Sequence, residues 1–425
     1  MLKILVPYPT AHEIPSGVST ILNGISKEIS KIHDITIIRL IFQSEKISKL
    51  PKNDKFNQVI DLHNFQNAFD AINSIKPDLI YGVPHKEFIT HSFLFASKHL
   101  GIPTAGLIFS GFDNNLQAKS NLFSSLKKVF DNSIPTDIYV NKKSFLRRLN
   151  FILYKILFLK KTYSQIYNPF SSLLKIVNFV LKSFTANPYR VDFPLTKSFV
   201  LNKFQKQILV KLGFNDNDVI VTGHPMFDDD IKKNLETKFH FGKTKNFLFA
   251  PDTLAESKIW TKEKQDETIN EILHILNDIP NSNVIVKVHP ASSKLEYFQK
   301  YIKKLNNKIE IHQKGSIDSY FETADFLVVY SLYSTSIIKA IIHKIPIIFY
   351  NVDDKLKDPF FLKSTNLIYE CKNFKQFSEI LNNLKNLDDV AEKNRSEYIS
   401  NYLYSDDGNA SKRISDEILK LLNKI

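Results

Sequence analysis

Short apolar runs alternate with segments of helical spacing in the first part of the chain. Ile21, Ile25 and Ile29 recur every four residues between two such runs, and this spacing is typical of one face of a helix. The predicted strands of this part are Lys3–Tyr8, Asp34–Phe42, Leu79–Tyr81 and Thr104–Phe109. Strands that alternate with helices indicate parallel βαβ units with right-handed crossovers.

The alternation resumes near residue 198 and continues through a second series. Ser198–Leu201 and Val219–Thr222 are predicted strands, and the polar, lysine-rich stretch Lys232–Lys245 is predicted to be a linker. The apolar runs of the second series lie at 246–252, 284–288, 309–313, 326–330 and 346–350. We therefore expect an α/β protein with two Rossmann-like domains, residues 1–235 and 240–396, that face each other across a cleft.

Residues 115–190 interrupt the pattern and carry most of the charge. The chain has a net charge of +13, and the segment Lys119–Ser183 contains twelve Lys or Arg but only two acidic residues. The stretch 142–161 combines this charge with large apolar side chains, which is typical of a helix on an anionic membrane surface. An ordinary helical insertion with solvated lysines fits the same pattern. Nucleic acid is the weaker interpretation because no nucleic-acid-binding motif accompanies the charge.

Composition limits the function classes further. The chain of 425 residues has 43% hydrophobic residues and a single cysteine, Cys371, which excludes an internal disulfide and a cysteine-based zinc site. No apolar run approaches the length of a membrane span, and the N-terminus resembles a buried strand more than a signal peptide. We expect a cytoplasmic protein, peripheral on the inner face of the membrane.

Hydroxyl side chains collect in the second half, where the run 326–330 meets the next helical segment. They belong to Ser331, Ser334, Thr335 and Ser336. Hydroxyls and free backbone N–H groups at a helix N-terminus suit a phosphate, and the helix dipole adds to the attraction. Simple capping by Ser334 or Ser336 is the alternative.

Other predicted strands of this half also end in polar residues. His289 and Pro290 follow the run 284–288, and Asp252 ends the first run, with Thr253 directly after it. Ligands of open parallel sheets bind beyond the carboxyl ends of the strands. We therefore predict that these residues line a phosphate site, with Gly315 forming a turn that a base or ribose can approach.

Candidate bases for a hydroxyl group follow the strands of the first half. They are Asp113, His12 and Glu13, with His85 and Gly17 predicted to line the acceptor side of the cleft. The run Asp228–Asp230 resembles a metal cluster in composition, but acidic residues also open helices. We expect no metal and no cofactor.

In this order and spacing, the motifs resemble GT-B fold glycosyltransferases. The likeness is to the capsule and surface polysaccharide group, with its polysialyltransferase-like and CDP-glycerol glycerophosphotransferase-like enzymes, related to UDP-N-acetylglucosamine 2-epimerases. His289 and Pro290 match the HP motif of that group, and Ser334–Ser336 match its serine motif. The resemblance implies that both motifs hold nucleotide-sugar phosphates without a metal. It also implies that the last helix, within residues 397–425, crosses back to the N-terminal domain.

The predicted function is transfer of a sugar from a nucleotide-sugar to a surface-polysaccharide, glycan or polyprenyl-linked acceptor. One residue departs from the resemblance: Lys339 stands where related enzymes have a glutamate that contacts ribose. Three alternatives therefore stay open. They are a 2-epimerase-like enzyme, a CDP-alditol phosphotransferase and a catalytically inactive sugar-binding protein.

Overall fold

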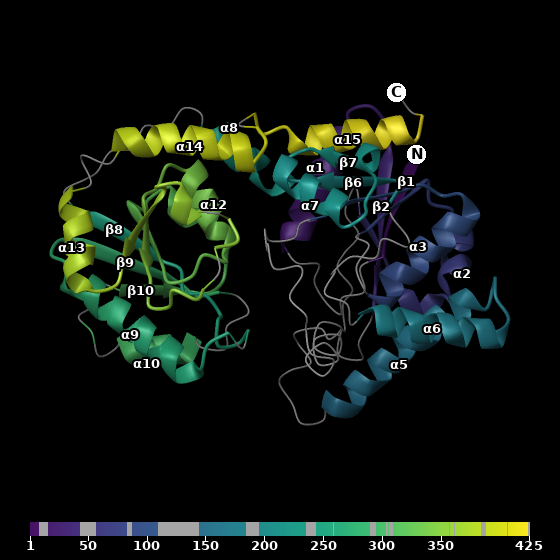
Figure 1. Cartoon of the computed structure of the whole chain (residues 1–425), viewed down its shortest axis with the longest axis horizontal. Helices are drawn as coiled ribbons and strands as arrows, with labels where there is room; N and C mark the ends of the chain where they lie inside the picture. Colours follow the sequence, from purple (N-terminus) through teal and green to yellow (C-terminus); the bar gives the residue numbers. More distant parts are fainter. Residues whose placement is uncertain are drawn as a thin grey trace. The chain divides into compact units, whose positions relative to one another are not determined.

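The structure of the chain is a computed structural model. It describes residues 1–7, 16–42, 57–82, 87–108, 144–183, 195–234, 244–257, 259–289, 295–302, 305, 309–356, 358–360, 362–383, 388–405 and 407–423. The chain divides into two compact units, Met1–Asp228 with Asn409–Ile425, and Asp229–Gly408 (Figure 1). Each unit is a parallel sheet covered by helices, so the predicted two-domain α/β architecture is confirmed.

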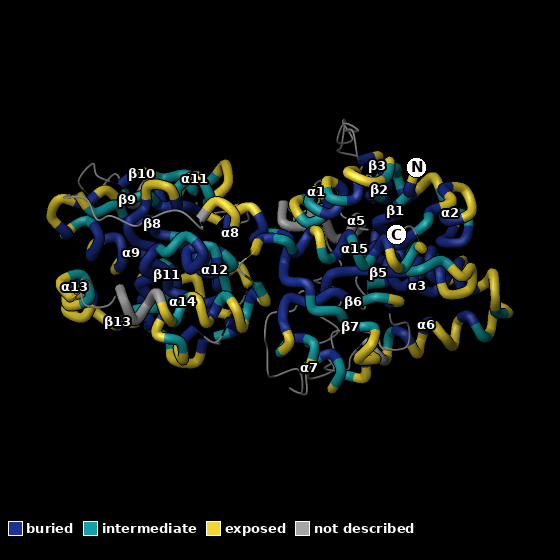
Figure 2. The backbone as a smooth tube through the Cα atoms, turned by 90° about the horizontal axis from the view of Figure 1, so that it is seen from above, coloured by how far each residue is buried: buried dark blue, intermediate teal, exposed yellow. Residues whose placement is uncertain are grey.

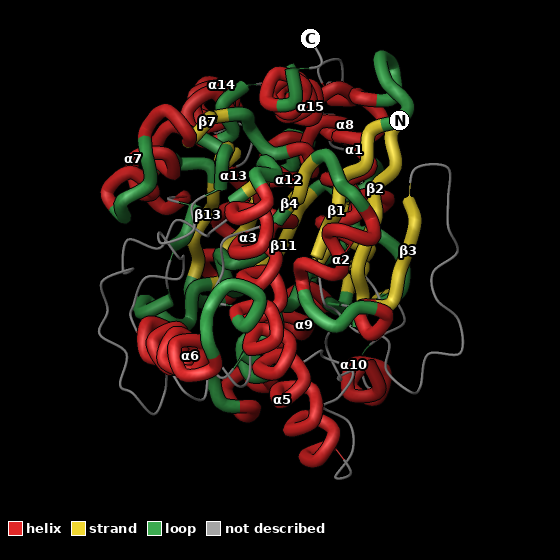
Figure 3. Tube along the Cα trace, turned by 90° about the vertical axis from the view of Figure 1, so that its right-hand side faces the viewer, coloured by secondary structure: helices red, strands yellow, loops and turns green. Residues whose placement is uncertain are grey.

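The first unit holds a parallel sheet in the order β3-β2-β1-β4-β5-β6-β7. Its strands are β1 (Leu2–Pro7), β2 (Ile35–Ile41), β3 (Asn57–Asp61), β4 (Leu79–Tyr81), β5 (Thr104–Leu107), β6 (Lys197–Val200) and β7 (Val219–Val221). β1 pairs with β2 from Leu2 opposite Ile35 onward. Figure 3 shows β1, β2 and β3 side by side. Strands β1 and β5 are almost fully buried, as expected for a sheet with both faces covered.

Helices of the first unit lie between its strands or follow them in the chain. They are α1 (Ser16–Ile29), α2 (Ala68–Ile75), α3 (Phe88–Leu100), α5 (Ser144–Tyr163), α6 (Pro169–Ser183), α7 (Lys203–Lys211), the start of α8 (Asp228–Asn234) and α15 (Ala410–Leu421). Of these, α2, α3 and α7 begin at polar side-chain caps. Glu87 caps α3 by accepting from the Thr90 amide, and Gly101 ends that helix in the left-handed conformation at φ 69°. Both ends follow ordinary capping chemistry.

The last helix, α15, packs within the first unit. Both carboxylate oxygens of the buried Asp228 accept from its N-terminal amides, those of Ala410 at 2.9 Å and Ser411 at 2.7 Å. Gly24 lets α1 approach α15 closely, because a Cβ at this position would lie 2.4 Å from the hydroxyl oxygen of Ser411. Asp228 therefore acts as a cap for a distant helix, as its charge opposite a helix dipole favours.

The second unit holds a six-stranded parallel sheet in the order β10-β9-β8-β11-β12-β13. Its strands are β8 (Lys245–Phe249), β9 (Ser282–Lys287), β10 (Ile309–His312), β11 (Phe326–Val329), β12 (Ile347–Tyr350) and β13 (Ile368–Cys371). Its helices are the rest of α8 and α9 (Lys262–Asp278), α10 (Leu295–Ile302), α11 (Asp318–Phe321), α12 (Thr335–Ile342), α13 (Phe374–Asn383) and α14 (Asp388–Tyr402). Order reverses between β8 and β11, and this topological switch point is where such sheets bind ligands.

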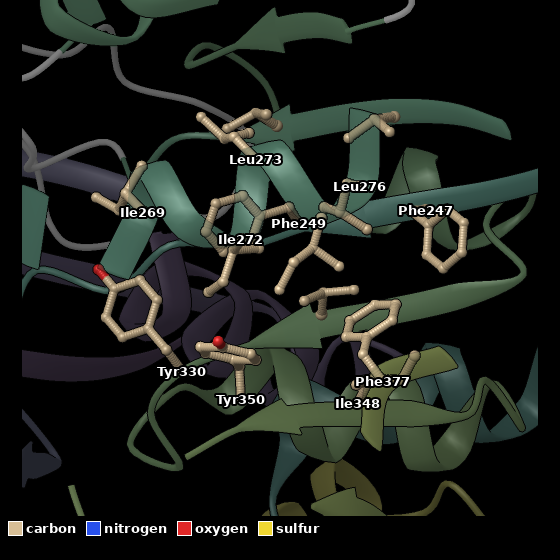
Figure 4. Packing of buried hydrophobic residues seen from close by; sticks show 14 of the residues in the cluster. Phe247, Phe249, Ile269, Ile272, Leu273, Leu276, Tyr330, Ile348, Tyr350 and Phe377 are labelled. Atoms are coloured by element: carbon tan, nitrogen blue, oxygen red, sulfur yellow. The ribbon is translucent and has the colours of Figure 1, made fainter. Parts of the chain in front are cut away.

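A dense apolar core fixes this sheet against α9. Phe247, Phe249, Ile272, Leu276 and Tyr330 belong to one buried cluster, part of which Figure 4 shows. At its edge the rings of Trp260 and Tyr330 stack at a centroid distance of 5.4 Å. Figure 2 shows the same distribution, with buried backbone through both sheets and exposed backbone on the outer helices. The carboxyl ends of β8 and β11 thus stand on a rigid base.

Candidate functional site

The strand-order reversal of the second unit brings Asp252 and Ser331 together. Asp252 follows β8 and Ser331 follows β11, and the Ser331 hydroxyl donates to Asp252 Oδ2 at 2.7 Å. The Thr253 amide donates to Asp252 Oδ1 at 2.7 Å, and the Tyr330 hydroxyl donates to the Asp252 carbonyl. Burial raises the pKa of Tyr330, and the nearby Asp252 acts in the same direction, so the phenol stays protonated. Three predicted residues thus meet at the switch point.

The serine motif forms the N-terminus of α12. Ser334 is the N-cap residue, and its hydroxyl oxygen accepts from the Ser336 amide at 3.3 Å. The two hydroxyl oxygens of Ser334 and Ser336 lie 2.6 Å apart, and Thr335 begins the helix. Capping, the simpler interpretation of these residues, is therefore realised. The same turn presents hydroxyls and helix amides close in sequence to Ser331, an arrangement that suits an anion.

His289 lies just beyond β9, and its side chain is exposed. Its carbonyl accepts from the Gln313 side-chain amide at 3.4 Å, which links it to the end of β10. Gly315 follows β10 at φ 82°, and a Cβ added there would meet no atom of the described residues within 4 Å, so the turn has open space beside it. Strand order puts these two residues on the side of β8 away from β11.

Lys287 is a buried cation at the end of β9, two residues before His289, and it was not predicted from the sequence. It is 5% exposed, and its ammonium donates to the Gln313 carbonyl at 2.8 Å. Burial lowers the pKa of this lysine. Its signal in the sequence is a charged residue within the otherwise apolar run 284–288.

Lys339 occupies an ion-pair cluster. Its ammonium lies 3.2 Å from Asp230 Oδ2 and 2.5 Å from Asp318 Oδ1. Asp230 also accepts from His343 Nε2 at 3.1 Å. The lysine that departs from the family resemblance thus has two carboxylate partners in its own unit. Asp230 belongs to the acidic run with a metal-like composition, and here it binds side chains of α12.

Several predicted site residues lie outside the described residues. They are His12, Glu13, His85, Asp113 and Pro290. Gly17 lies in the first turn of α1. Glu87, an acidic residue near the end of β4, caps α3 and pairs with Lys155 at 2.7 Å. Within the described part of the chain, no group of three or more His, Cys, Asp or Glu residues is placed to hold a metal.

The site lies within a segment that matches a known family. Residues 222–352 match the model of the alpha-2,8-polysialyltransferase family (POLYST). This range contains Asp252, His289 and Ser331–Ser336. The resemblance predicted from the motifs is confirmed, and the match supports the prediction of a glycosyltransferase enzyme. No protein of curated function matches the chain significantly.

Solved structures match the fold over the whole chain. The S. aureus MnaA–UDP complex covers 100% of this chain and 98% of its own at a TM-score of 0.56 and 13% identity. UDP-GlcNAc 2-epimerase from Neisseria meningitidis, bound to UDP-GlcNAc, covers 99% of this chain and 100% of its own, at a TM-score of 0.53 and 16% identity. A variant of the wall teichoic acid polymerase TagF covers 100% of this chain and 89% of its own, at a TM-score of 0.54 and 11% identity. At these identities the likeness shows the fold. Among the described helices, none has the length and apolar content to span a membrane.

Proposed function

We propose that this protein transfers a sugar from a nucleotide-sugar donor to a surface-polysaccharide, glycan or polyprenyl-linked acceptor. The observation that carries the proposal is the junction of Asp252, Ser331 and the α12 N-terminus at the switch point of a sheet within the polysialyltransferase match. Hydroxyls and helix amides at that point would stabilise the negative charge of the departing nucleotide phosphate. This chemistry requires no metal.

The donor side of the proposal includes the residues around that junction. Thr253, His289 and Gly315 follow strands of the same sheet, and the exposed side chain of His289 is accessible to a phosphate oxygen. Solved proteins of this fold contain UDP or UDP-GlcNAc, which supports a nucleotide-sugar ligand. We place a general base in the first unit, at Asp113 or at His12 and Glu13, with Gly17 and His85 on the acceptor side.

A 2-epimerase activity is the second candidate. UDP-N-acetylglucosamine 2-epimerases share the fold along the full chain, and that reaction needs no acceptor. Incubation with a UDP-sugar alone separates the two: an epimerase converts it to the epimer, whereas a transferase needs an acceptor for sugar transfer. Release of CMP from a CDP-alditol would instead indicate a phosphotransferase.

The first test is a thermal-shift screen with UDP, CMP, CDP and GDP. A ligand at one hundred times its Kd stabilises a protein by about 2.7 kcal/mol, so the matching nucleotide should raise the Tm clearly. We expect His289→Ala and Ser336→Ala to reduce this shift and to slow sugar transfer at least tenfold. His274→Ala is the control because His274 is an exposed histidine of the same unit on α9. If His289→Ala kept full donor binding and turnover, the site assignment would be wrong.

The proposed location is the inner face of the membrane, where a polyprenyl-linked acceptor would be found. The supporting observation is the local charge of Lys119–Ser183, which holds twelve basic and two acidic residues. Basic segments of this kind are attracted to anionic lipids.

A further inference from the structure

Helix α6 carries two apolar stripes on different faces. Ile176 and Phe179 are buried in the core of the first unit. A second stripe is exposed to solvent, and its residues are between 48% and 70% accessible. The members of this stripe are Phe170, Leu173, Leu174, Val177 and Leu181. Their spacing of three and four residues puts them on one side of the helix, and Figure 2 colours much of α6 as exposed.

The neighbouring helix α5 supports α6 from the inside. Phe158, Leu159 and Tyr163 of α5 are buried in the same cluster as Phe179. Lys155 is buried as well and pairs with Glu87 at 2.7 Å. The apolar side chains of the stretch 142–161 that the structure describes thus serve largely to pack this unit, as an ordinary helical insertion would. The exposed apolar surface belongs mainly to the next helix.

A contiguous exposed apolar stripe is typical of a surface that contacts another protein or a membrane. The charge around it indicates which of the two. In sequence, residues 144–183 contain seven Lys or Arg and no Asp or Glu, although a stretch of this length with the average acidic content of the chain would hold about four. Lys160, Lys161 and Lys175 are exposed. A second copy of the chain would bring the same positive charge to the contact, whereas an anionic surface would be attracted.

We propose that the exposed stripe of α6 inserts into the interface of an anionic lipid bilayer, with these lysines contacting the headgroups. Interfacial helices bury one apolar face to the headgroup–acyl boundary and keep basic residues at the headgroups. The buried face of α6 fixes the stripe on a folded domain, so docking requires no unfolding. The inference deepens the proposed function and rests on it only for the lipid-linked acceptor, since membrane binding itself needs no donor.

The test uses the full chain and vesicles of phosphatidylcholine with or without phosphatidylglycerol. We expect co-sedimentation with the anionic vesicles only, weakening as salt is raised. The double variant Phe170→Gln/Leu174→Gln should lose at least tenfold in vesicle affinity. Phe374→Gln/Ile32→Gln is the matched control, because these two apolar residues are also exposed, at 50% and 62%, and lie on other elements. Lys160→Gln/Lys161→Gln should weaken binding by about 25-fold, since each of the two basic residues near an anionic surface contributes about 1 kcal/mol, or roughly fivefold.

Insertion is checked by placing a fluorophore on the stripe. Cys371 is fully buried, so Leu174→Cys can be labelled selectively with a polarity-sensitive dye. Its emission should shift to the blue on anionic vesicles, while a dye at Ile32→Cys should not respond. Circular dichroism and Tm confirm that each variant is folded.

Three outcomes would overturn the inference. They are equal vesicle binding by the stripe variant and the wild type, binding that ignores lipid charge, or a dimer that the stripe variant converts to monomer. The nucleotide-induced Tm shift is measured on the same variants. Because that shift depends on the other unit, it should be unchanged, and failure of membrane docking is thereby distinguished from failure of the proposed function.

Discussion

Replacing Lys339 tests whether the departure from the family resemblance is structural. The side chains of Lys339 and Asp230 are only 13% and 11% exposed, and their charged atoms lie 3.2 Å apart. The lysine ammonium also lies 2.5 Å from Asp318. Substitution by methionine preserves most of the side-chain volume and removes the charge, which leaves Asp230 with His343 as a remaining partner. Substitution by glutamate places a third carboxylate at this point.

The size of the effect follows from the burial of the pair. Breaking a buried ion pair by removing one partner costs about 3–5 kcal/mol. Two features reduce the loss here: His343 still donates to Asp230 at 3.1 Å, and the carboxylate of Asp318 is 39% exposed, so solvent screens it. We therefore expect Lys339→Met to lower the free energy of unfolding of the second unit by about 3 kcal/mol, the low end of that range. Lys339→Glu should cost more because like charges repel.

The pH dependence gives a second readout of the same pair. Burial acts to raise the pKa of Asp230, but the hydrogen bond from His343 and the charge of Lys339 outweigh it, and the pKa lies below its ordinary 3.8. A lowered carboxyl pKa stabilises the folded state above pH 3.8, and this stability is lost as the pH falls through the folded value. The difference between wild type and Lys339→Met should therefore shrink under acidic conditions.

Urea denaturation followed by tryptophan fluorescence measures these effects. Trp260 is the only tryptophan of the chain and is buried in the second unit, so its emission reports on that unit. The midpoint should fall with an unchanged m value. Lys355→Glu is the control because it reverses the charge of an exposed lysine in the same unit. A Lys339→Glu protein as stable as the wild type would refute the reasoning.

Two further predictions concern the first unit. Burial lowers the pKa of His224 to about 3 from an ordinary 6.5, so the stability from this residue should be complete above pH 6.5 and fall by roughly 1.4 kcal/mol per pH unit below it. His224→Asn keeps an acceptor for the Met226 amide and should flatten this loss in acid titrations followed by circular dichroism. An unchanged titration would contradict the assignment. A Cβ at Gly106 would lie 1.7 Å from the Gly82 carbonyl oxygen, so Gly106→Ala should destabilise the unit by about 3 kcal/mol or more. Gly82→Ala is the control, since its Cβ would meet the Thr90 side chain at an ordinary 3.4 Å. Equal Tm values for the two variants would count against the argument.

Most strands could be predicted because both sheets are buried on two faces. Continuous apolar runs form the central strands of the structure. The run 326–330, for example, contains β11, whose four residues are all buried. The edge strands β3 and β13 were missed. β3 reads Asn57–Asp61 and is only partly buried, and β13 has intermediate or exposed residues at three of its four positions. A strand at the edge of a sheet faces solvent, so its sequence need not be apolar.

Only the part of the candidate site that lies at the ends of predicted strands could be predicted from the sequence. Asp252 and Ser331 follow two predicted strands, and the parallel topology alone brings their ends to one edge. The partners of Lys339 could not be found this way. Asp230 precedes it by more than a hundred residues, and no periodicity relates a side chain of α8 to one of α12. Likewise, the exposed stripe of α6 has the spacing of a core-facing stripe, and only the packed structure shows which of its two apolar faces is covered.

The position of Lys339 also limits what the donor site can use. A glutamate at this point would stand beside Asp230 and Asp318, and three neighbouring carboxylates would raise one another's pKa. The lysine and its two acidic partners are therefore one arrangement, in which α12 is bound to α8 and to the start of α11. In the proposed donor site, an acceptor for ribose hydroxyls must then be another group at the carboxyl ends of the strands. Lys339→Arg, which keeps the charge, should preserve both stability and nucleotide binding, whereas a lysine that itself contacted the donor would not tolerate the change in shape.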